Sequence, residues 1–323
     1  ATIALRDSGS TTLRSVRTDS GDIAVSAAGS IDVQSVNAGY GANNVSLQAG
    51  EAITQGQARN NVLNRVAVLS LPVSQANVVA NNLQLSAGTG IGNGERGALV
   101  TDVKTIDAST ATGNASIDQA NAVTVSNLST GGGDATLVVR QGDATVGNVS
   151  ATGTAMLTTE AGSLQDDGNA DTRIVADSAN LTASGNVNAG TRVNTLTANG
   201  QAITIDEQDG LARLTATASN GDVNVTSRTG DVIVDQVANQ AVVGNGRTHG
   251  LEIVAIGALA GDDVAVDGHT LDLAILDLLD EVGIVEGLRL VRAGEVVHHR
   301  HQDSRDDQPQ DQILCHIVQL TTL

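Results

Sequence analysis

The sequence lacks the large side chains that normally fill a compact core. It has no Phe or Trp, and Tyr40, Met156 and Cys315 are each the only residue of their kind, although 40% of the chain is hydrophobic. A core must therefore be built from Ala, Val, Leu and Ile, whereas ordinary domains also use aromatic rings. The length of 323 residues alone suggests two globular domains. The missing aromatics favour instead a solenoid, which stacks one thin cross-section many times.

Positive charge is also scarce. The chain carries 17 Lys and Arg against 36 Asp and Glu, a net charge of −19, and Lys104 is its only lysine. Nucleic acid is excluded as a partner, because binding a phosphate backbone needs a clustered basic face and usually stacking aromatics. The single cysteine excludes an internal disulfide. No apolar run reaches the ~20 residues of a membrane span, so we expect no transmembrane segment.

Short strands are what the sequence does contain. From Ile3 to about Asp267, apolar residues recur with a spacing of two, as in Ile23–Val25 and Val45–Leu47. This spacing indicates strands that bury one face and expose the other. Val232–Val234 is apolar throughout, which predicts that it is covered on both faces.

A turn unit precedes many of these strands: Gly, then Asp, Asn, Ser or Gln, then an apolar residue. Examples are Gly21-Asp22-Ile23, Gly142-Asp143-Ala144 and Gly221-Asp222-Val223. Glycine permits the positive φ of a tight corner, and Asp or Asn can cap the turn through nearby backbone N–H groups. Units about eight to ten residues apart fit either a meander of hairpins or a β-helix. Hairpin sandwiches normally depend on aromatic cross-strand pairs, so the composition favours a parallel β-helix.

Residues 1–268 are predicted to form the β-helical shaft. At about 20 to 25 residues per coil it would have roughly eleven to thirteen coils and a length of about 55 to 60 Å. Irregular stretches at Gly56–Asn64, Gly88–Gly97 and Gln165–Asp171 are expected to bulge out as loops. Ala1 is preceded by no initiator Met or leader, which is expected of a segment or processed product of a longer protein.

Residues 269–323 differ in pattern and are predicted to be a separate cap or tail. Apolar residues between Leu271 and Val282 fall at helical spacing, which predicts a short amphipathic helix. A polar linker follows at 298–309, and Ile313–Leu320 is predicted to be a terminal strand.

The repeated Gly-Asp-apolar units and the Asn/Ala/Thr-rich spacers, such as Asn180–Val187, resemble large bacterial exoproteins of the filamentous haemagglutinin type. Autotransporter passengers share such repeats. The resemblance implies a right-handed parallel β-helix, export through an outer-membrane partner, and adhesion at the cell surface to a receptor or glycan of a host or neighbouring cell. The Asn-Pro-Asn motifs of the family's secretion domain are missing, since Pro72 follows Leu71 and Pro309 follows Gln308. The resemblance thus covers the shaft without its export parts.

A carbohydrate-active enzyme is the alternative from a different class, because β-helices also host polysaccharide hydrolases and lyases. Such enzymes need clustered carboxylates with a nearby His and a basic residue. Asp166–Asp167, Asp262–Asp263 and His249 are the fragments that fit, but Lys104 has no acid cluster beside it. We therefore interpret these aspartates as turn caps and predict no catalytic residue.

Two segments raise the question of a metal. Gly131–Asp134 resembles half of a calcium-binding nonapeptide, which would make the chain a calcium-dependent β-roll, but such sites need tandem repeats. His298, His299 and His301, with Cys315 further on, could bind a transition metal. Adjacent histidines in a polar stretch rarely form a shaped site. The sequence predicts neither a metal site nor a cofactor.

Overall fold

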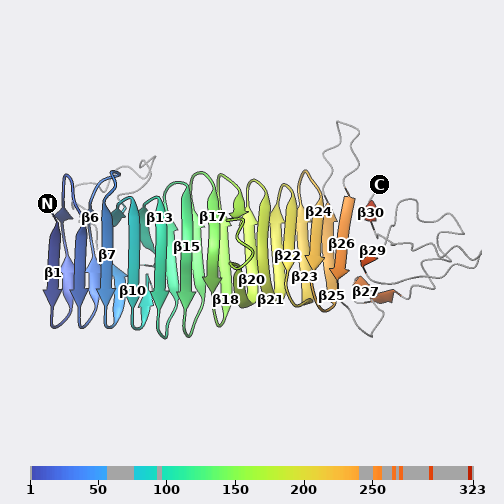
Figure 1. Cartoon of the computed structure of the whole chain (residues 1–323), viewed down its shortest axis with the longest axis horizontal. Coiled ribbons are helices and arrows are strands. Elements are labelled where there is room, and N and C mark those ends of the chain that lie inside the picture. Colours follow the sequence, from blue (N-terminus) through green and yellow to red (C-terminus); the bar gives the residue numbers. More distant parts are fainter. Residues whose placement is uncertain are drawn as a thin grey trace, which may run out of the picture.

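The chain forms one long parallel β-solenoid. The structure is a computed structural model that describes residues 2–56, 76–92 and 97–239, and five short strands between 250 and 321. In these residues every regular element is a strand, and the strands wind into about 11 turns. Figure 1 shows them lying across the long axis, with β1 at one end and β26 near the other. The parallel β-helix predicted from the sequence is confirmed.

The strands range from two residues to the 14 of β21, which bends around a corner and pairs on two faces. In chain order they are β1 (Ile3–Asp7), β2 (Thr11–Leu13), β3 (Val16–Arg17), β4 (Ile23–Ala27), β5 (Ile31–Val33), β6 (Val36–Asn37), β7 (Asn44–Ala49), β8 (Ala52–Gln55), β9 (Val78–Val79), β10 (Asn82–Ala87), β11 (Gly90–Ile91), β12 (Leu99–Asp102), β13 (Thr105–Thr110), β14 (Ala115–Gln119), β15 (Val123–Thr130), β16 (Ala135–Val139), β17 (Ala144–Ser150), β18 (Thr154–Thr159), β19 (Leu164–Asp166), β20 (Ile174–Ala183), β21 (Val187–Gly200), β22 (Ile203–Glu207), β23 (Leu211–Ala218), β24 (Val223–Ser227), β25 (Val232–Asn239), β26 (Gly250–Ile256), β27 (Val264–Val266), β28 (His269–Leu271), β29 (Val291–Ala293) and β30 (Gln319–Thr321).

From β1 to β25, each strand pairs in parallel with a strand one coil later. Ile3 pairs with Ile23, and Ile23 with Val45. Coils vary in length: Leu164 pairs with Val187, 23 residues on, and Val187 with Ile203, 16 residues on. At about 4.8 Å per coil, the turns give a rod roughly 50 Å long. This is slightly shorter than the predicted length, because the number of coils is at the low end of the predicted range.

The core is a set of apolar columns that run along the rod. Ile23, Val45, Leu83 and Ile106 are successive partners in one column, and each is at most 1% exposed. The intervening residues face outward, which confirms the predicted strands with one buried face. The prediction for Val232–Val234 is wrong, because Ile233 lies on the outer face and is 40% exposed.

Five corners share a hydrogen bond that closes the turn. A Thr or Ser hydroxyl donates to the backbone carbonyl of a Gly three residues later, in the pairs Thr18–Gly21, Thr110–Gly113, Thr130–Gly133, Thr159–Gly162 and Ser227–Gly230. The glycine is needed where coils approach closely. A Cβ on Gly113 would lie 1.6 Å from the carbonyl oxygen of Thr89 in the preceding coil. The corner motif is therefore Thr/Ser-x-x-Gly, which extends the Gly-Asp unit seen in the sequence.

The residue after the corner glycine links neighbouring coils. The Asn114 side-chain oxygen accepts the backbone N–H of Asp134 at 2.9 Å, and Asp134 accepts that of Thr154 at 2.8 Å. In the same way Asp143 accepts the N–H of Ser163. The predicted caps exist, but these three bind the backbone of the next coil rather than of their own turn.

Of the three predicted loops, Gln165–Asp171 is found in part, because Gln165 and Asp166 belong to β19 and the loop extends to residue 173. The chain leaves the solenoid between β19 and β20, at residues 167–173. The loop predicted at Gly88–Gly97 is wrong for its first residues, because Gly90–Ile91 forms strand β11, which pairs with β8 and β14. Gly88 stacks closely on Gly50, which explains the glycine there. Gly56–Asn64 lies outside the described residues after Gly56.

Most of the predicted tail lies outside the described residues. Leu271, the first residue of the predicted amphipathic helix, ends β28, and the rest of that helix is not described. The described end of the predicted terminal strand overlaps β30, which pairs antiparallel with β26. The domain boundary at 268/269 stays a prediction.

Candidate functional site

The 167–173 loop interrupts the regular coils, and two residues singled out in the sequence lie at its start. Asp166 ends β19 and Asp167 begins the loop. The remaining candidates lie outside the described residues: His249, Asp262, Asp263, His298, His299, His301 and Cys315.

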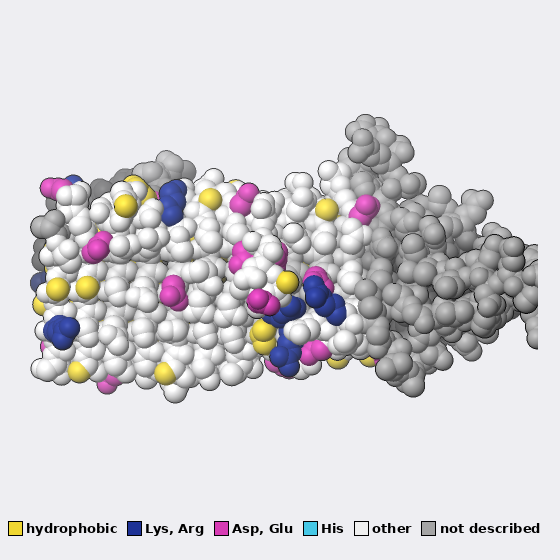
Figure 2. All heavy atoms as spheres, viewed as in Figure 1, with side chains coloured by type: hydrophobic (Ala, Val, Ile, Leu, Met, Phe, Trp, Pro, Cys, Tyr) yellow, Lys and Arg dark blue, Asp and Glu magenta, His cyan; other side chains and the backbone are white. Residues whose placement is uncertain are grey.

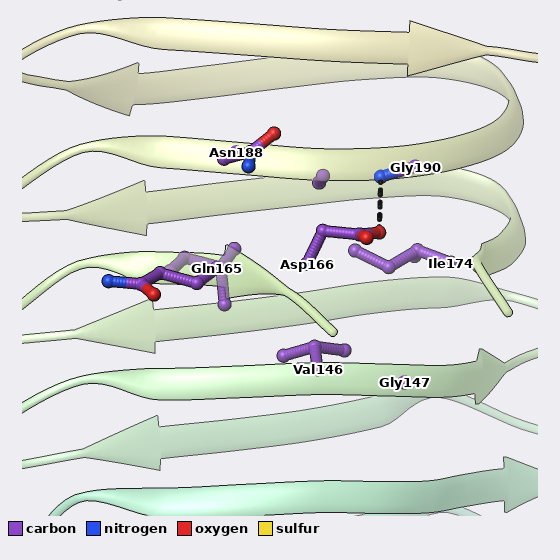
Figure 3. Close-up of a pocket in the computed structure, with 9 residues that line it drawn as sticks. Val146, Gly147, Gln165, Asp166, Ile174, Asn188 and Gly190 are labelled. Atoms are coloured by element: carbon purple, nitrogen blue, oxygen red, sulfur yellow. Dashed lines mark hydrogen bonds between the residues drawn. The ribbon is translucent and has the colours of Figure 1, made fainter. Parts of the chain in front are cut away.

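Asp166 takes a place that belongs to an apolar column. Val125 pairs with Val146, and Val146 with Asp166. A carboxylate there needs hydrogen bonds to offset its lost hydration. Its two oxygens accept the N–H groups of Gly168 at 2.7 Å and Gly190 at 3.2 Å. Figure 3 shows the carboxylate directed at Gly190, whose missing side chain leaves it room.

Asp167 shapes the loop itself. Its Oδ1 accepts the backbone N–H of Asn169 at 2.9 Å and the hydroxyl of Thr172 at 2.6 Å. The N–H of Thr172 donates to the carbonyl of Asn169 at 3.0 Å, which closes a second turn. Both aspartates thus hold the backbone, as the turn-cap interpretation predicts.

The loop forms one wall of an open cleft of about 250 Å³. Loop residues from Gly168 to Arg173 face Asn188, Ala189 and Gly190 of β21, and Asp206 and Arg228 come from the next coils. Arg173 donates through Nη2 to the carbonyl of Ala170 at 2.8 Å, while its Nη1 is buried without a hydrogen-bond partner. The cleft therefore combines two guanidinium groups, two carboxylates and side-chain amides.

Charge is balanced inside the cleft. Arg228 grips Asp206 through Nε at 2.9 Å and through Nη2, and this contact lowers the pKa of the Asp206 carboxyl. Arg173 adds to the same effect. Figure 2 shows charged side chains of both signs gathered on this face, at the level of β20–β24. Neighbouring pairs at Arg192–Asp209 and Arg213–Asp235 extend this group.

Another carboxylate, that of Glu207, lies inside the rod and directly follows Asp206 in the sequence. Glu207 is 0% exposed, and its partners in the column, Thr191 and Ser227, are equally buried. The Thr191 hydroxyl donates to it at 2.7 Å and the Gln208 N–H at 2.9 Å. Burial raises the pKa of the Glu207 carboxyl to about 7. The hydrogen bonds to this carboxylate thus come from neutral donors.

The sequence reasoning missed Arg173, Asp206 and Arg228. The spacing in the sequence between an acidic and a basic residue could have identified Asp206 and Arg228. Asp206 and Arg228 are 22 residues apart, which is one coil plus two residues, because Asp206 pairs with Thr226. Asp118 and Arg140 show the same spacing and the same kind of contact. Charge pairs at this spacing therefore indicate cross-coil ion pairs.

The calcium half-motif is used as a corner. Thr130 closes the turn on Gly133, and Asp134 accepts a backbone N–H from the next coil. Across the residues that the structure describes, no three His, Cys, Asp or Glu side chains form a group that could hold a metal ion.

Comparison with protein-family models, curated proteins and solved structures finds no match to this chain. Within the described part of the chain, no helix is long and apolar enough to span a bilayer. In the described residues, the geometry defines a parallel β-solenoid with a charged surface cleft.

Proposed function

We propose that the chain is a structural and adhesive segment of a secreted bacterial exoprotein of the filamentous haemagglutinin type, displayed on the cell surface. The observation that carries this proposal is the stack of about 11 turns with a largely polar outer face. Exposed Asn44 donates and accepts across coils with Asn82 and Asp22, so the outer side chains form ordered ladders. A rod of this kind holds binding regions away from a cell and offers repeated weak contacts.

The partner on this proposal is a receptor or glycan on a host or neighbouring cell, with an outer-membrane protein as the export partner. The coil-by-coil stacking of the rod supports this role. Each coil contacts mainly its neighbours, so the rod can vary in length without redesign of a central core. Uncharged exposed residues such as Thr124 and Thr204 leave the outer face able to make hydrogen bonds.

Attachment of coated beads tests the proposal. Beads that carry the purified chain are expected to bind epithelial or bacterial cells more than albumin-coated beads do, and soluble chain should compete. A variant with Asn82, Thr124 and Thr204 all changed to Asp should bind less, because it adds three negative charges to an acidic rod and so strengthens electrostatic repulsion. Circular dichroism provides the control for folding. Attachment equal to that of albumin on every cell type tested would sink the adhesive role.

A polysaccharide hydrolase or lyase is the second candidate, and the cleft with Asp166 and Asp206 is the observation that favours it. Release of reducing or unsaturated ends from acidic polysaccharides is the assay. Asp166→Asn keeps an oxygen acceptor for the loop, so it should remain folded and lose turnover. Absence of new chain ends with every substrate eliminates this candidate.

A further inference from the structure

The cleft beside the 167–173 loop has donors that the chain leaves unused. Arg173 Nη1 is buried with no hydrogen-bond partner, although Arg173 lines the cleft. A buried donor without an acceptor costs free energy, and charged donors cost more than neutral ones. An oxygen supplied by a ligand would remove this cost once the guanidinium turns toward the open side of the cleft.

The opposite wall offers further polar groups. Arg228 contacts Asp206 through Nε and Nη2, which leaves Nη1 for another acceptor. Asn188 is exposed and lines the cleft. Two guanidinium groups in one cleft suit a carboxylate, which accepts several charge-assisted hydrogen bonds.

Acceptors are present as well. Asp166 and Asp206 each have lone pairs beyond the contacts described above, so they can accept hydrogen bonds from hydroxyl groups. The space of about 250 Å³ admits a molecule of the size of one sugar ring. Its polar lining and lack of aromatic rings disfavour an apolar ligand.

We propose that this cleft binds a small hydroxylated carboxylate of sugar-acid size, with the carboxylate held by Arg173 and Arg228 and the hydroxyls facing Asp166 and Asp206. The ligand is either free or the end of an oligosaccharide. Binding here does not depend on surface display, so the site goes beyond the adhesive role.

Ligand-observed NMR with glucuronate tests this directly on the full chain. A Kd of about 1 mM is expected for a ligand of this size, and glucose, which has the same ring without the carboxylate, should bind at least tenfold more weakly. A glucuronate-terminated oligosaccharide forms the second arm. Tighter binding of that arm assigns the glycan end as the source, and equal or weaker binding assigns the free acid.

Variants of single residues distinguish binding in the cleft from attraction to any positive charge on the rod. Arg173→Gln and Arg228→Gln are expected to weaken glucuronate binding at least tenfold, whereas Arg213→Gln, whose partner is Asp235 outside the cleft, should leave it unchanged. Asn188→Ala changes an exposed side chain that lines the cleft, so it still tests the site if the arginine variants misfold. A several-fold loss is expected for it. No glucuronate signal up to 10 mM, or an equal loss in Arg213→Gln, overturns the proposal. Bead attachment is scored separately, so failure of one leaves the other readable.

Discussion

Replacing Leu137 by Ala is expected to lower the free energy of unfolding by about 3 kcal/mol, with a range of roughly 2 to 5. Leu137 is 1% exposed and pairs in register with Ile117 in the preceding coil and Leu157 in the next. Removal of three carbon atoms from a column of this kind leaves a cavity on both sides. Urea unfolding followed by circular dichroism measures the loss.

The loss should be local as well as large. Because each coil contacts mainly its neighbours, hydrogen exchange should rise in β14, β16 and β18 and stay low in distant coils. Met156→Ala is the matched control, since Met156 lies next to Leu157 but is 42% exposed, and it should change stability little. An even rise of exchange across the rod, or equal losses in both variants, contradicts the column account.

Glu207→Gln is expected to make the protein more stable at pH 8, on the order of 2–3 kcal/mol. The folded-state pKa of Glu207 is raised to about 7 from the ordinary value of 4.5 because the group is buried. The folded protein therefore holds a proton that the unfolded chain releases between these values. Stability from this group is complete below about pH 4.5 and is lost as pH rises through about 7. Glutamine stays neutral and keeps an oxygen for the Gln208 N–H.

Thermal unfolding from pH 4 to pH 8 measures this difference. The two proteins should have similar midpoints at pH 4 and diverge as pH rises, with the variant the more stable. Glu51→Gln serves as the control because Glu51 is exposed, and its midpoint should follow that of the wild type. A variant that is less stable than wild type at pH 8 would show that the ionised carboxylate stabilises the rod.

The architecture could be predicted because it depends on local patterns. Apolar spacing of two, as in Ile23–Val25, sets which side chains enter the core, and the corner glycines set where strands end. The exact coil lengths could not, since the 23 residues from Leu164 to Val187 and the 16 from Val187 to Ile203 are set by pairing between coils and not by the local pattern. The exposed position of Ile233 could not be predicted either. An apolar residue on an outer face costs little free energy, and the spacing pattern does not exclude it.

The candidate site could be predicted only in part. Asp166 and Asp167 are adjacent in sequence and were visible as a carboxylate pair beside an expected loop. Arg173, Asp206 and Arg228 come from three different coils, and the short coil that holds Gly190 lies between Arg173 and Asp206, so their meeting depends on its register. Nor does the sequence show that Asp166 binds two backbone N–H groups, because that requires Gly168 and Gly190 to lie within reach.

Distances between spin labels along one outer column test the central claim most directly. Asn82, Thr124 and Thr204 are exposed and belong to one column, in which Asn82 precedes Thr124 by two coils and Thr204 follows Thr124 by four. Each can be changed to Cys in a Cys315→Ser background and labelled in pairs. The stack predicts about 19 Å between the 124 and 204 backbones and about 29 Å between 82 and 204, at about 4.8 Å per coil. A 124–204 distance equal to or longer than the 82–204 distance would contradict the solenoid.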